Sequence, residues 1–164
     1  MQRHGDQLVK GGIALLQFGG NDCDFNWAAI SRDPAADHLP QVPLKDFIQQ
    51  YKLLIQRLSD LGYQPLVLNL PPLIQDRFFA TVSKGLAADT ILEWLGGTTD
   101  SIYYWHQSYS DAVEQMALKA KLPLIDIRTV FEGEPQVEDL VCEDGIHPNE
   151  KGHALIARTL KAYR

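Results

Sequence analysis

Residues 44–70 read LKDFIQQYKLLIQRLSDLGYQPLVLNL, a helical pattern followed directly by a short apolar run. From Leu44 to Leu61, apolar side chains recur every three or four residues, as they do on the buried face of an amphipathic helix. Gly62 stands where such a helix ends. Pro65–Leu70 is an apolar run stopped by Pro71–Pro72, which cannot continue a strand ladder, so we predict a strand there.

Comparable patterns lie on both sides of this helix and strand. Ile13–Phe18 is almost continuously apolar, which is typical of a strand buried on both faces of a parallel sheet. Further predicted elements are a long ordered loop over residues 23–43, helices over residues 83–95 and about 102–121, a third strand at Pro123–Ile127, an acidic loop over residues 132–144 and a last helix after Asn149. Parallel strands need crossover connections, so we expect one α/β domain over residues 1–164, with helices on both faces of a parallel sheet.

The composition excludes several classes of function. With 45% hydrophobic and 22% charged residues the chain fits a single globular domain. Its formal charge of −6 and lack of a Lys and Arg cluster argue against a nucleic-acid partner. No apolar run approaches the roughly 20 residues that span a bilayer, and the first residues do not resemble a signal peptide. We therefore expect a cytoplasmic protein, although an export signal is possible if residues before Met1 exist.

The two cysteines, Cys23 and Cys142, are too few for a disulfide framework and are predicted to be reduced thiols that fill small packing sites. Cys23 lies two residues from Asn21, and Cys142 lies two residues from Asp144, both of which belong to the motifs described next. Pairing of the two cysteines therefore stays open as an alternative.

Asp144 and His147 lie three residues apart, just before the predicted last helix. A histidine that acts as a general base needs one ring nitrogen free and the other held by an acceptor. The Asp144 carboxylate can supply that acceptor, and Pro148 restricts the backbone of His147 to extended conformations. The alternative is that Asp144 and Asn149 only cap the helix and that His147 is an ordinary surface residue.

A second motif, Gly19-Gly20-Asn21-Asp22, follows the first predicted strand. Glycines allow the chain to turn sharply at a strand end, and an asparagine amide can donate a hydrogen bond to an oxyanion. The same residues are also common in ordinary turns, which is the alternative interpretation. Because both motifs follow strands of one parallel sheet, we expect them to lie near one crevice at the carboxyl ends of the strands.

Together the two motifs resemble the SGNH or GDSL-type hydrolase family of lipases and acylhydrolases. Its third signature block is Gly-x-Asn-Asp and its fifth is Asp-x-x-His, which here are Gly19–Asp22 and Asp144–His147. The resemblance covers the chain from about residue 13 to the C-terminus. It implies a flavodoxin-like three-layer sandwich and hydrolysis of a small-molecule ester, and no cofactor or metal is expected.

The resemblance also implies roles for single residues. His147 would be the general base, Asp144 its orienting partner and Asn21 a donor to the oxyanion. Gly19 and Asp22 would shape the turn. Acetyl esters on sugars, short acyl esters and thioesters would all use this machinery, so the substrate stays open.

The beginning of the chain departs from the family pattern. The family's first block, Gly-Asp-Ser, carries the nucleophilic serine, but here Gly5-Asp6 is followed by Gln7, and every serine comes after Asp22. We therefore expect that an N-terminal segment of roughly 40–50 residues, enough for two strands and their helices, is missing. Without those strands Ile13–Phe18 becomes an exposed edge, so self-association through it is possible.

Two functions from different classes follow. The first is an ester hydrolase of the SGNH type whose serine lies upstream of this chain, and the second is an inactive, truncated or degenerate homologue that acts as a binding or assembly module. Cys23 as a replacement nucleophile, and a metal held by Asp144, His147 and His153, have no supporting spacing and are not favoured. Five aromatic residues are candidates for either an acyl pocket or the core: Phe25, Trp27, Tyr103, Tyr104 and Trp105.

Overall fold

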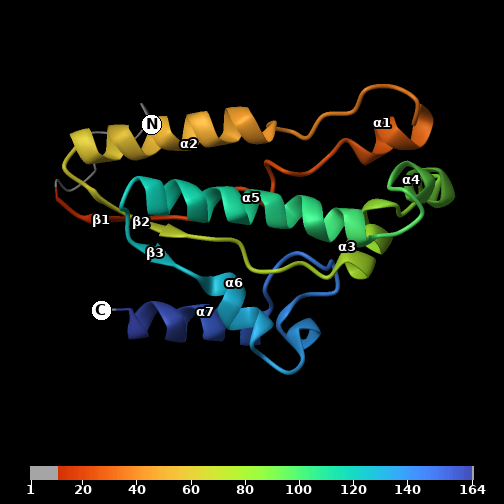
Figure 1. Ribbon diagram of the computed structural model, residues 1–164. Coiled ribbons are helices and arrows are strands. Elements are labelled where there is room, and N and C mark those ends of the chain that lie inside the picture. The colour runs from red at the N-terminus through yellow and green to blue at the C-terminus, as the bar shows by residue number, and fades with distance from the viewer. Residues whose placement is uncertain (1–10, 164) are drawn as a thin grey trace.

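The computed structural model describes residues 11–163, which form a small parallel sheet with helices on both sides (Figure 1). In chain order the elements are β1 (Ile13–Leu16), α1 (Trp27–Arg32), α2 (Leu44–Asp60), β2 (Gln64–Leu68), α3 (Gln75–Val82), α4 (Ala88–Trp94), α5 (Asp100–Lys119), β3 (Leu124–Ile125), α6 (Ile127–Glu132), the 3-10 helix η2 (Val137–Leu140) and α7 (Glu150–Ala162). The α/β class predicted from the sequence is confirmed. No helix within residues 11–163 is long and apolar enough to cross a membrane.

The sheet has three strands in the order β1-β2-β3, and both pairs are parallel. Ile13 is opposite Gln64 at the start of the first pair, and Leu68 is opposite Ile125 at the end of the second. Because all three strands run in one direction, their carboxyl ends meet at one edge of the sheet, where loops can converge.

Helices α2 and α5 pack together on one face of the sheet. Phe47, Tyr51, Ile55 and Leu58 follow one another at steps of three or four residues and are all buried, as the sequence pattern predicts for α2. They share one cluster with Val67 of β2. Burying such a side chain stabilises the fold by roughly 1.5–3 kcal/mol, so this layer is the main core.

The opposite face is covered only in part. Leu66 and Leu68 of β2 alternate with Val67 and pack toward the α7 side, where Leu160 joins them. On β1 the corresponding side chains remain uncovered, with Ile13 69% and Leu15 50% exposed. The prediction that this strand is buried on both faces is wrong, because no helix within residues 11–163 covers its second face. The predicted exposed edge is confirmed for the described residues, since β1 is the outer strand of their sheet.

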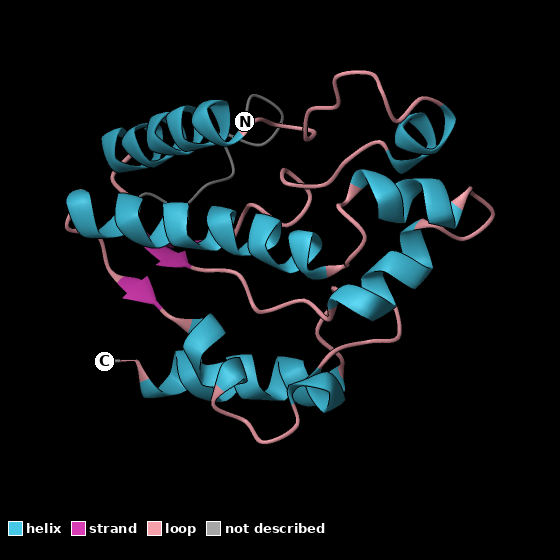
Figure 2. Ribbon diagram, turned by 45° about the vertical axis from the view of Figure 1, so that its right-hand side comes forward, coloured by secondary structure: helices cyan, strands magenta, loops and turns pink. Residues whose placement is uncertain are grey.

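Beyond the carboxyl ends of the strands, α1, α3, α4 and the start of α5 form a second apolar cluster (Figures 1 and 2). This part was the least well predicted. Residues 23–43 are not one loop, because they contain α1. The helix predicted over residues 83–95 is confirmed only as the shorter α4, and α3, which ends at Val82, was not predicted.

Other predictions differ at their boundaries. The third strand is confirmed but has only two residues, since Asp126 caps α6 by accepting a hydrogen bond from the Thr129 backbone N–H. The predicted acidic loop over residues 132–144 contains the 3-10 helix η2. Helices α2 and α5 and the last helix after Asn149 are confirmed.

Candidate active site

The segment before α7 is a tight loop fixed by its own backbone. Val141 and Pro148 form an antiparallel bridge, and inside it the Cys142 N–H donates to the His147 carbonyl at 2.8 Å. Asn149 caps α7, and its side chain accepts from the N–H groups of Lys151 and Gly152. The loop therefore holds His147 in place before any ligand binds.

Gly145 lets this loop lie directly on α3. Its φ of +80° is in the left-handed region, and its carbonyl accepts from the Ile74 N–H at 2.7 Å. A Cβ at this position would overlap backbone atoms of Ile74, Arg77 and Phe78. No role of Gly145 was predicted from the sequence, although a glycine beside Asp144 is a typical turn signal.

Asp144 and His147 form a hydrogen-bonded pair. The Nδ1 of His147 lies 2.7 Å from Oδ2 of Asp144, while Oδ1 of Asp144 accepts from the backbone N–H groups of Ile146 and His147 at 3.0 and 3.1 Å. Burial alone would raise the pKa of Asp144, but these hydrogen bonds outweigh it and lower that pKa below its ordinary value. The His147 side chain is 72% exposed. Its Nε2 edge is therefore accessible to a reacting group.

The motif after β1 forms a closed turn. The Gly19 N–H donates to Oδ2 of Asp22 at 3.0 Å, and the Cys23 N–H donates to the Gly19 carbonyl at the same distance. Gly19 has a φ of +128°, and a Cβ there would press against Leu70. Asn21 lies at the tip of this turn with its side chain exposed.

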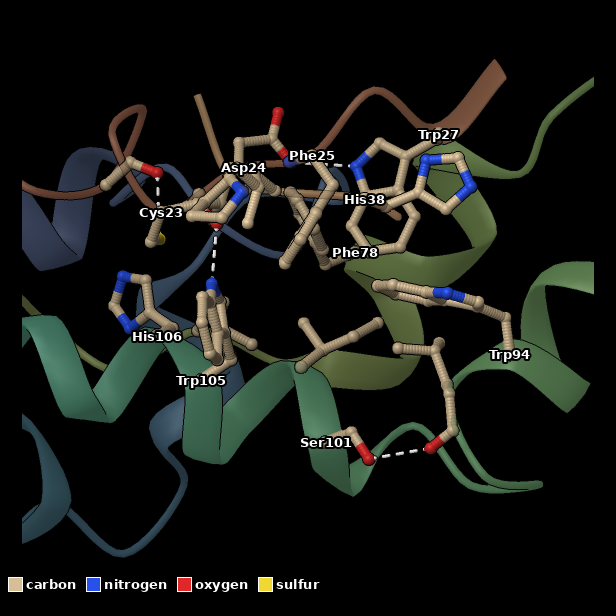
Figure 3. A pocket seen from close by; sticks show the side chains of 17 residues that line it. Cys23, Asp24, Phe25, Trp27, His38, Phe78, Trp94, Ser101, Trp105 and His106 are labelled. Atoms are coloured by element: carbon tan, nitrogen blue, oxygen red, sulfur yellow. Dashed lines mark hydrogen bonds between the residues drawn. The ribbon is translucent and has the colours of Figure 1, made fainter. Parts of the chain in front are cut away.

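A cavity of about 340 Å³ connects the two motifs (Figure 3). Gly20, beside Asn21, lies on its wall, and so does Ile146, beside His147. The remaining lining comes from the second apolar cluster and the loops around it: Cys23, Asp24, Phe25, Trp27, His38, Leu39, Pro40, Leu73, Phe78, Trp94, Leu95, Ser101, Ile102, Trp105 and His106. Asn21 and His147, which are both exposed, are thus each next in sequence to a residue that lines this apolar cavity.

The model of the GDSL-like lipase/acylhydrolase family matches residues 2–155. The chain belongs to that family. The resemblance inferred from the two motifs is therefore confirmed for nearly the whole sequence. A comparison with curated protein sequences finds no match.

Solved structures with the same fold are also similar to this GDSL-like chain. They include a lipase/acylhydrolase from Enterococcus faecalis (TM-score 0.61, 12% identity, 90% of this chain and 58% of that one). A GDSL-like lipase from Bacteroides thetaiotaomicron has a TM-score of 0.58 and 12% identity, over 91% of this chain and 60% of that one. LAE5, an alpha/beta hydrolase from the metagenome of Lake Arreo, Spain, has a TM-score of 0.61 and 17% identity, over 98% of this chain and 62% of that one. The chain thus spans about three fifths of the length of these proteins, and at such identities the likeness concerns the fold.

Three of the five aromatic residues singled out in this GDSL-like sequence line the cavity, namely Phe25, Trp27 and Trp105. The other two do not. Tyr103 lies under the Arg128 guanidinium, 5.2 Å from ring centroid to Cζ, and Tyr104 is 67% exposed. Trp94 and Phe78 also line the cavity but were missed, because α3 and α4 were not correctly predicted, and His38 of the loop between α1 and α2 was missed as well.

The cysteines of this family member are both free, so the alternative of a disulfide is wrong. Cys23 is buried, and its Sγ donates to the Gly20 carbonyl at 3.2 Å. Burial, together with the nearby Asp24 carboxylate, raises the pKa of Cys23 to about 12. The Cys23 thiol is therefore protonated at neutral pH, which makes it a poor nucleophile.

The structure shows no metal cluster in the part of the chain that it describes, because no three His, Cys, Asp or Glu side chains within residues 11–163 come together. His106, on the cavity wall, is 3% exposed, and burial, with a smaller effect of Arg128, lowers its pKa to about 3. Its imidazole is therefore neutral at physiological pH, and it belongs to the packed wall of the cavity.

Proposed function

We propose that this chain carries the general base, its orienting acid and one oxyanion donor of a serine ester hydrolase. The supporting observation is the 2.7 Å contact between His147 Nδ1 and Asp144 Oδ2. The rest of the His147 side chain is exposed, and its neighbour Ile146 lines the apolar cavity. Membership of the GDSL-like lipase/acylhydrolase family supports the same reaction class. The substrate on this proposal is a small-molecule ester.

The geometry suits the following sequence of steps. His147 Nε2 takes the proton of a serine hydroxyl as the serine oxygen attacks the acyl carbonyl, and Asp144 stabilises the imidazolium that forms. The Asn21 amide donates an N–H to the carbonyl oxygen as it becomes an oxyanion. His147 then gives its proton to the leaving alcohol, and water releases the acid from the acyl-serine by the same two steps.

The nucleophile on this proposal is a serine that precedes Met1, as the order of the family's sequence blocks implies. Five of the six serines of the chain make hydrogen bonds with main-chain groups. Ser110 is fully buried and accepts from the Leu70 N–H, while the hydroxyls of Ser83, Ser101 and Ser108 each donate to a main-chain carbonyl. None of the hydrogen bonds described for His147 within residues 11–163 involves a serine.

A fluorophosphonate probe, which reacts with activated serines, tests this proposal. The chain is expressed once as Met1–Arg164 and once with the residues that its gene encodes upstream of Met1. We expect labelling of a serine only in the extended protein, and at least about a hundredfold slower labelling in its His147→Ala variant. His153→Ala is the matched control, because His153 is an exposed histidine on α7 six residues further on. Labelling that is equal in both variants would contradict the role of His147.

A second candidate function is assembly, and the open edge of β1 favours it. Ile13, Leu15 and Phe18 are 69%, 50% and 46% exposed, and β1 pairs only with β2 among the described residues. An uncovered apolar edge strand is able to pair with a strand of another chain. On this alternative the chain self-associates through β1 whether or not it is catalytic.

A further inference from the structure

The cavity beside the dyad is apolar and has little charge. Its side chains include five large aromatic rings, and no Lys or Arg of residues 11–163 lines it. Asp24 is the one carboxylate on the wall, and its Oδ1 already accepts from the Phe25 N–H at 2.9 Å and from the Trp27 indole N–H at 2.7 Å. Such a lining is suited to an apolar group and gives an anionic group no partner.

The walls of the cavity are fixed. The indole N–H of Trp105 donates to the Cys23 carbonyl at 2.8 Å, and the Asp24 carboxylate holds Trp27 from the same loop (Figure 3). Behind the rings, Ile30 and Ile91 are fully buried between α1 and α4. A hollow whose walls are held in this way is preorganised, so little ordering is needed when a ligand enters.

The aromatic rings contact one another rather than surrounding a central point. Phe25 lies 5.2 Å from Trp94 and 5.4 Å from Trp105, measured between ring centroids, with tilted or edge-to-face geometry. Trp27 makes further contacts of this kind with Phe25 and Trp94. Because the rings pack against one another, they do not surround a space in which an ammonium group could be held. An uncharged apolar occupant is therefore favoured.

The position of the cavity relative to the motifs gives the occupant an orientation. Gly20 and Ile146 lie on its wall, and their neighbours Asn21 and His147 are exposed. An ester whose carbonyl lies between Asn21 and His147 can place its acyl group into the hollow. A two-carbon acetyl group would leave most of the 340 Å³ empty.

We propose that this cavity is an acyl-binding site and that the substrates are esters of bulky apolar acids, with aryl or medium-chain alkyl acyl groups rather than acetyl. The proposal rests on the proposed ester hydrolysis for the reaction that follows binding. Binding itself requires neither the serine nor His147, so it can be measured on Met1–Arg164 as it stands.

The three tryptophans of the chain, Trp27, Trp94 and Trp105, all line this cavity, so tryptophan emission reports on it alone. The probe is N-methyloctanamide, an uncharged amide that is not readily hydrolysed, and N-methylacetamide is the matched ligand with the same head group. We expect saturable changes in emission for both, with N-methyloctanamide binding at least about tenfold more tightly, since each buried methylene strengthens binding up to roughly fourfold.

Two leucines of similar exposure provide a test variant and its matched control, because only one of them lines the cavity. Leu39 lines the cavity and is 72% exposed, whereas Leu118 on α5 is 70% exposed and is not part of the lining. Leu39→Glu is expected to weaken N-methyloctanamide binding by at least about threefold, and Leu118→Glu is expected to leave it unchanged. Equal binding of the two amides, no saturable response, or equal weakening by both variants would overturn the acyl site. None of these binding results depends on labelling by the fluorophosphonate. A failure of the acyl-site proposal can therefore be distinguished from a failure of the hydrolase proposal.

Discussion

At the scale of single residues, Asn69 and Asn21 carry the same side chain in opposite surroundings. Asn69 is fully buried at the end of β2, and its amide donates to Glu114 and Asp126 at 2.7 and 2.6 Å. Its Oδ1 accepts from the N–H groups of Ile127 and Arg128. Asn69 therefore joins the sheet to α5 and α6, while the exposed Asn21 is free for a ligand.

Replacing Asn69 by alanine should destabilise the fold. Two buried backbone N–H groups and two carboxylates would each lose a hydrogen bond, so we expect the free energy of unfolding to fall by about 3 kcal/mol. Asn21→Ala should change it by less than about 0.5 kcal/mol. Urea unfolding of the two variants measures the difference, and similar losses of stability would contradict it.

The lowered pKa of Asp144 predicts a pH-dependent contribution to stability. A carboxylate whose pKa is lower in the folded state stabilises the fold above its unfolded pKa, about 3.9, and this stabilisation is lost as the pH falls through the folded pKa. Asp144→Asn should therefore be less stable than the wild type at pH 7, and the difference should shrink below about pH 4. Urea unfolding at pH 7 and pH 3 tests this, and a difference that stays constant would argue against it.

At the scale of elements, the sequence predicts the long helices α2, α5 and α7, whereas the six-residue helices α1 and α6 were not predicted even though Asn26 and Asp126 cap them. Helix α2 buries four residues along one face, from Phe47 to Leu58, and α7 begins at the capping side chain of Asn149. Helices α3 and α4 are short and begin after Ile74 and Ala87, neither of which caps with its side chain. These helices are stabilised by their contacts in the second apolar cluster, and local sequence patterns do not report such contacts.

The docking of the Asp144–His147 loop on α3 is testable with two glycines of similar backbone conformation. Gly145 and Gly85 have φ values of +80° and +77°, but a Cβ would meet the backbone of α3 only at Gly145. Gly85→Ala should cost about 1 kcal/mol for its left-handed conformation, and Gly145→Ala at least about 3 kcal/mol because of the added overlap. Thermal unfolding of both variants is the measurement. Equal losses of stability would show that the backbone shifts to remove the overlap at position 145 and would contradict the prediction.

At the scale of the whole molecule, the open edge of β1 should govern association. We expect the wild-type chain to form dimers or larger species in size-exclusion chromatography with light scattering as its concentration rises. Leu15→Lys places a charge on the uncovered face and should shift the chain toward the monomer. Leu118→Lys, at an equally apolar but separate exposed site, should not. A wild-type chain that stays monomeric at high concentration would rule out this role of β1.

The site could be predicted from the sequence only where its parts are close in the chain. Asp144 and His147 are three residues apart, so their spacing allowed the pair that the structure contains, with helix capping as the open alternative. The cavity could not be predicted, because its wall joins Trp27 to Trp94 through contacts between α1 and α4. Such contacts depend on how α1 and α4 pack together, which local sequence patterns do not report.

The uneven distribution of tryptophan also makes the cooperativity of folding observable. The main core between the sheet, α2 and α5 contains Tyr51 and Tyr109 but no tryptophan, whereas all three indoles lie around the cavity beyond the strand ends. On heating, tryptophan emission therefore follows the loosening of that end, and far-UV circular dichroism follows every helix. Coincident transitions would identify one cooperative unit, and an earlier change in emission would show that the cavity end melts while the sheet and its two long helices persist.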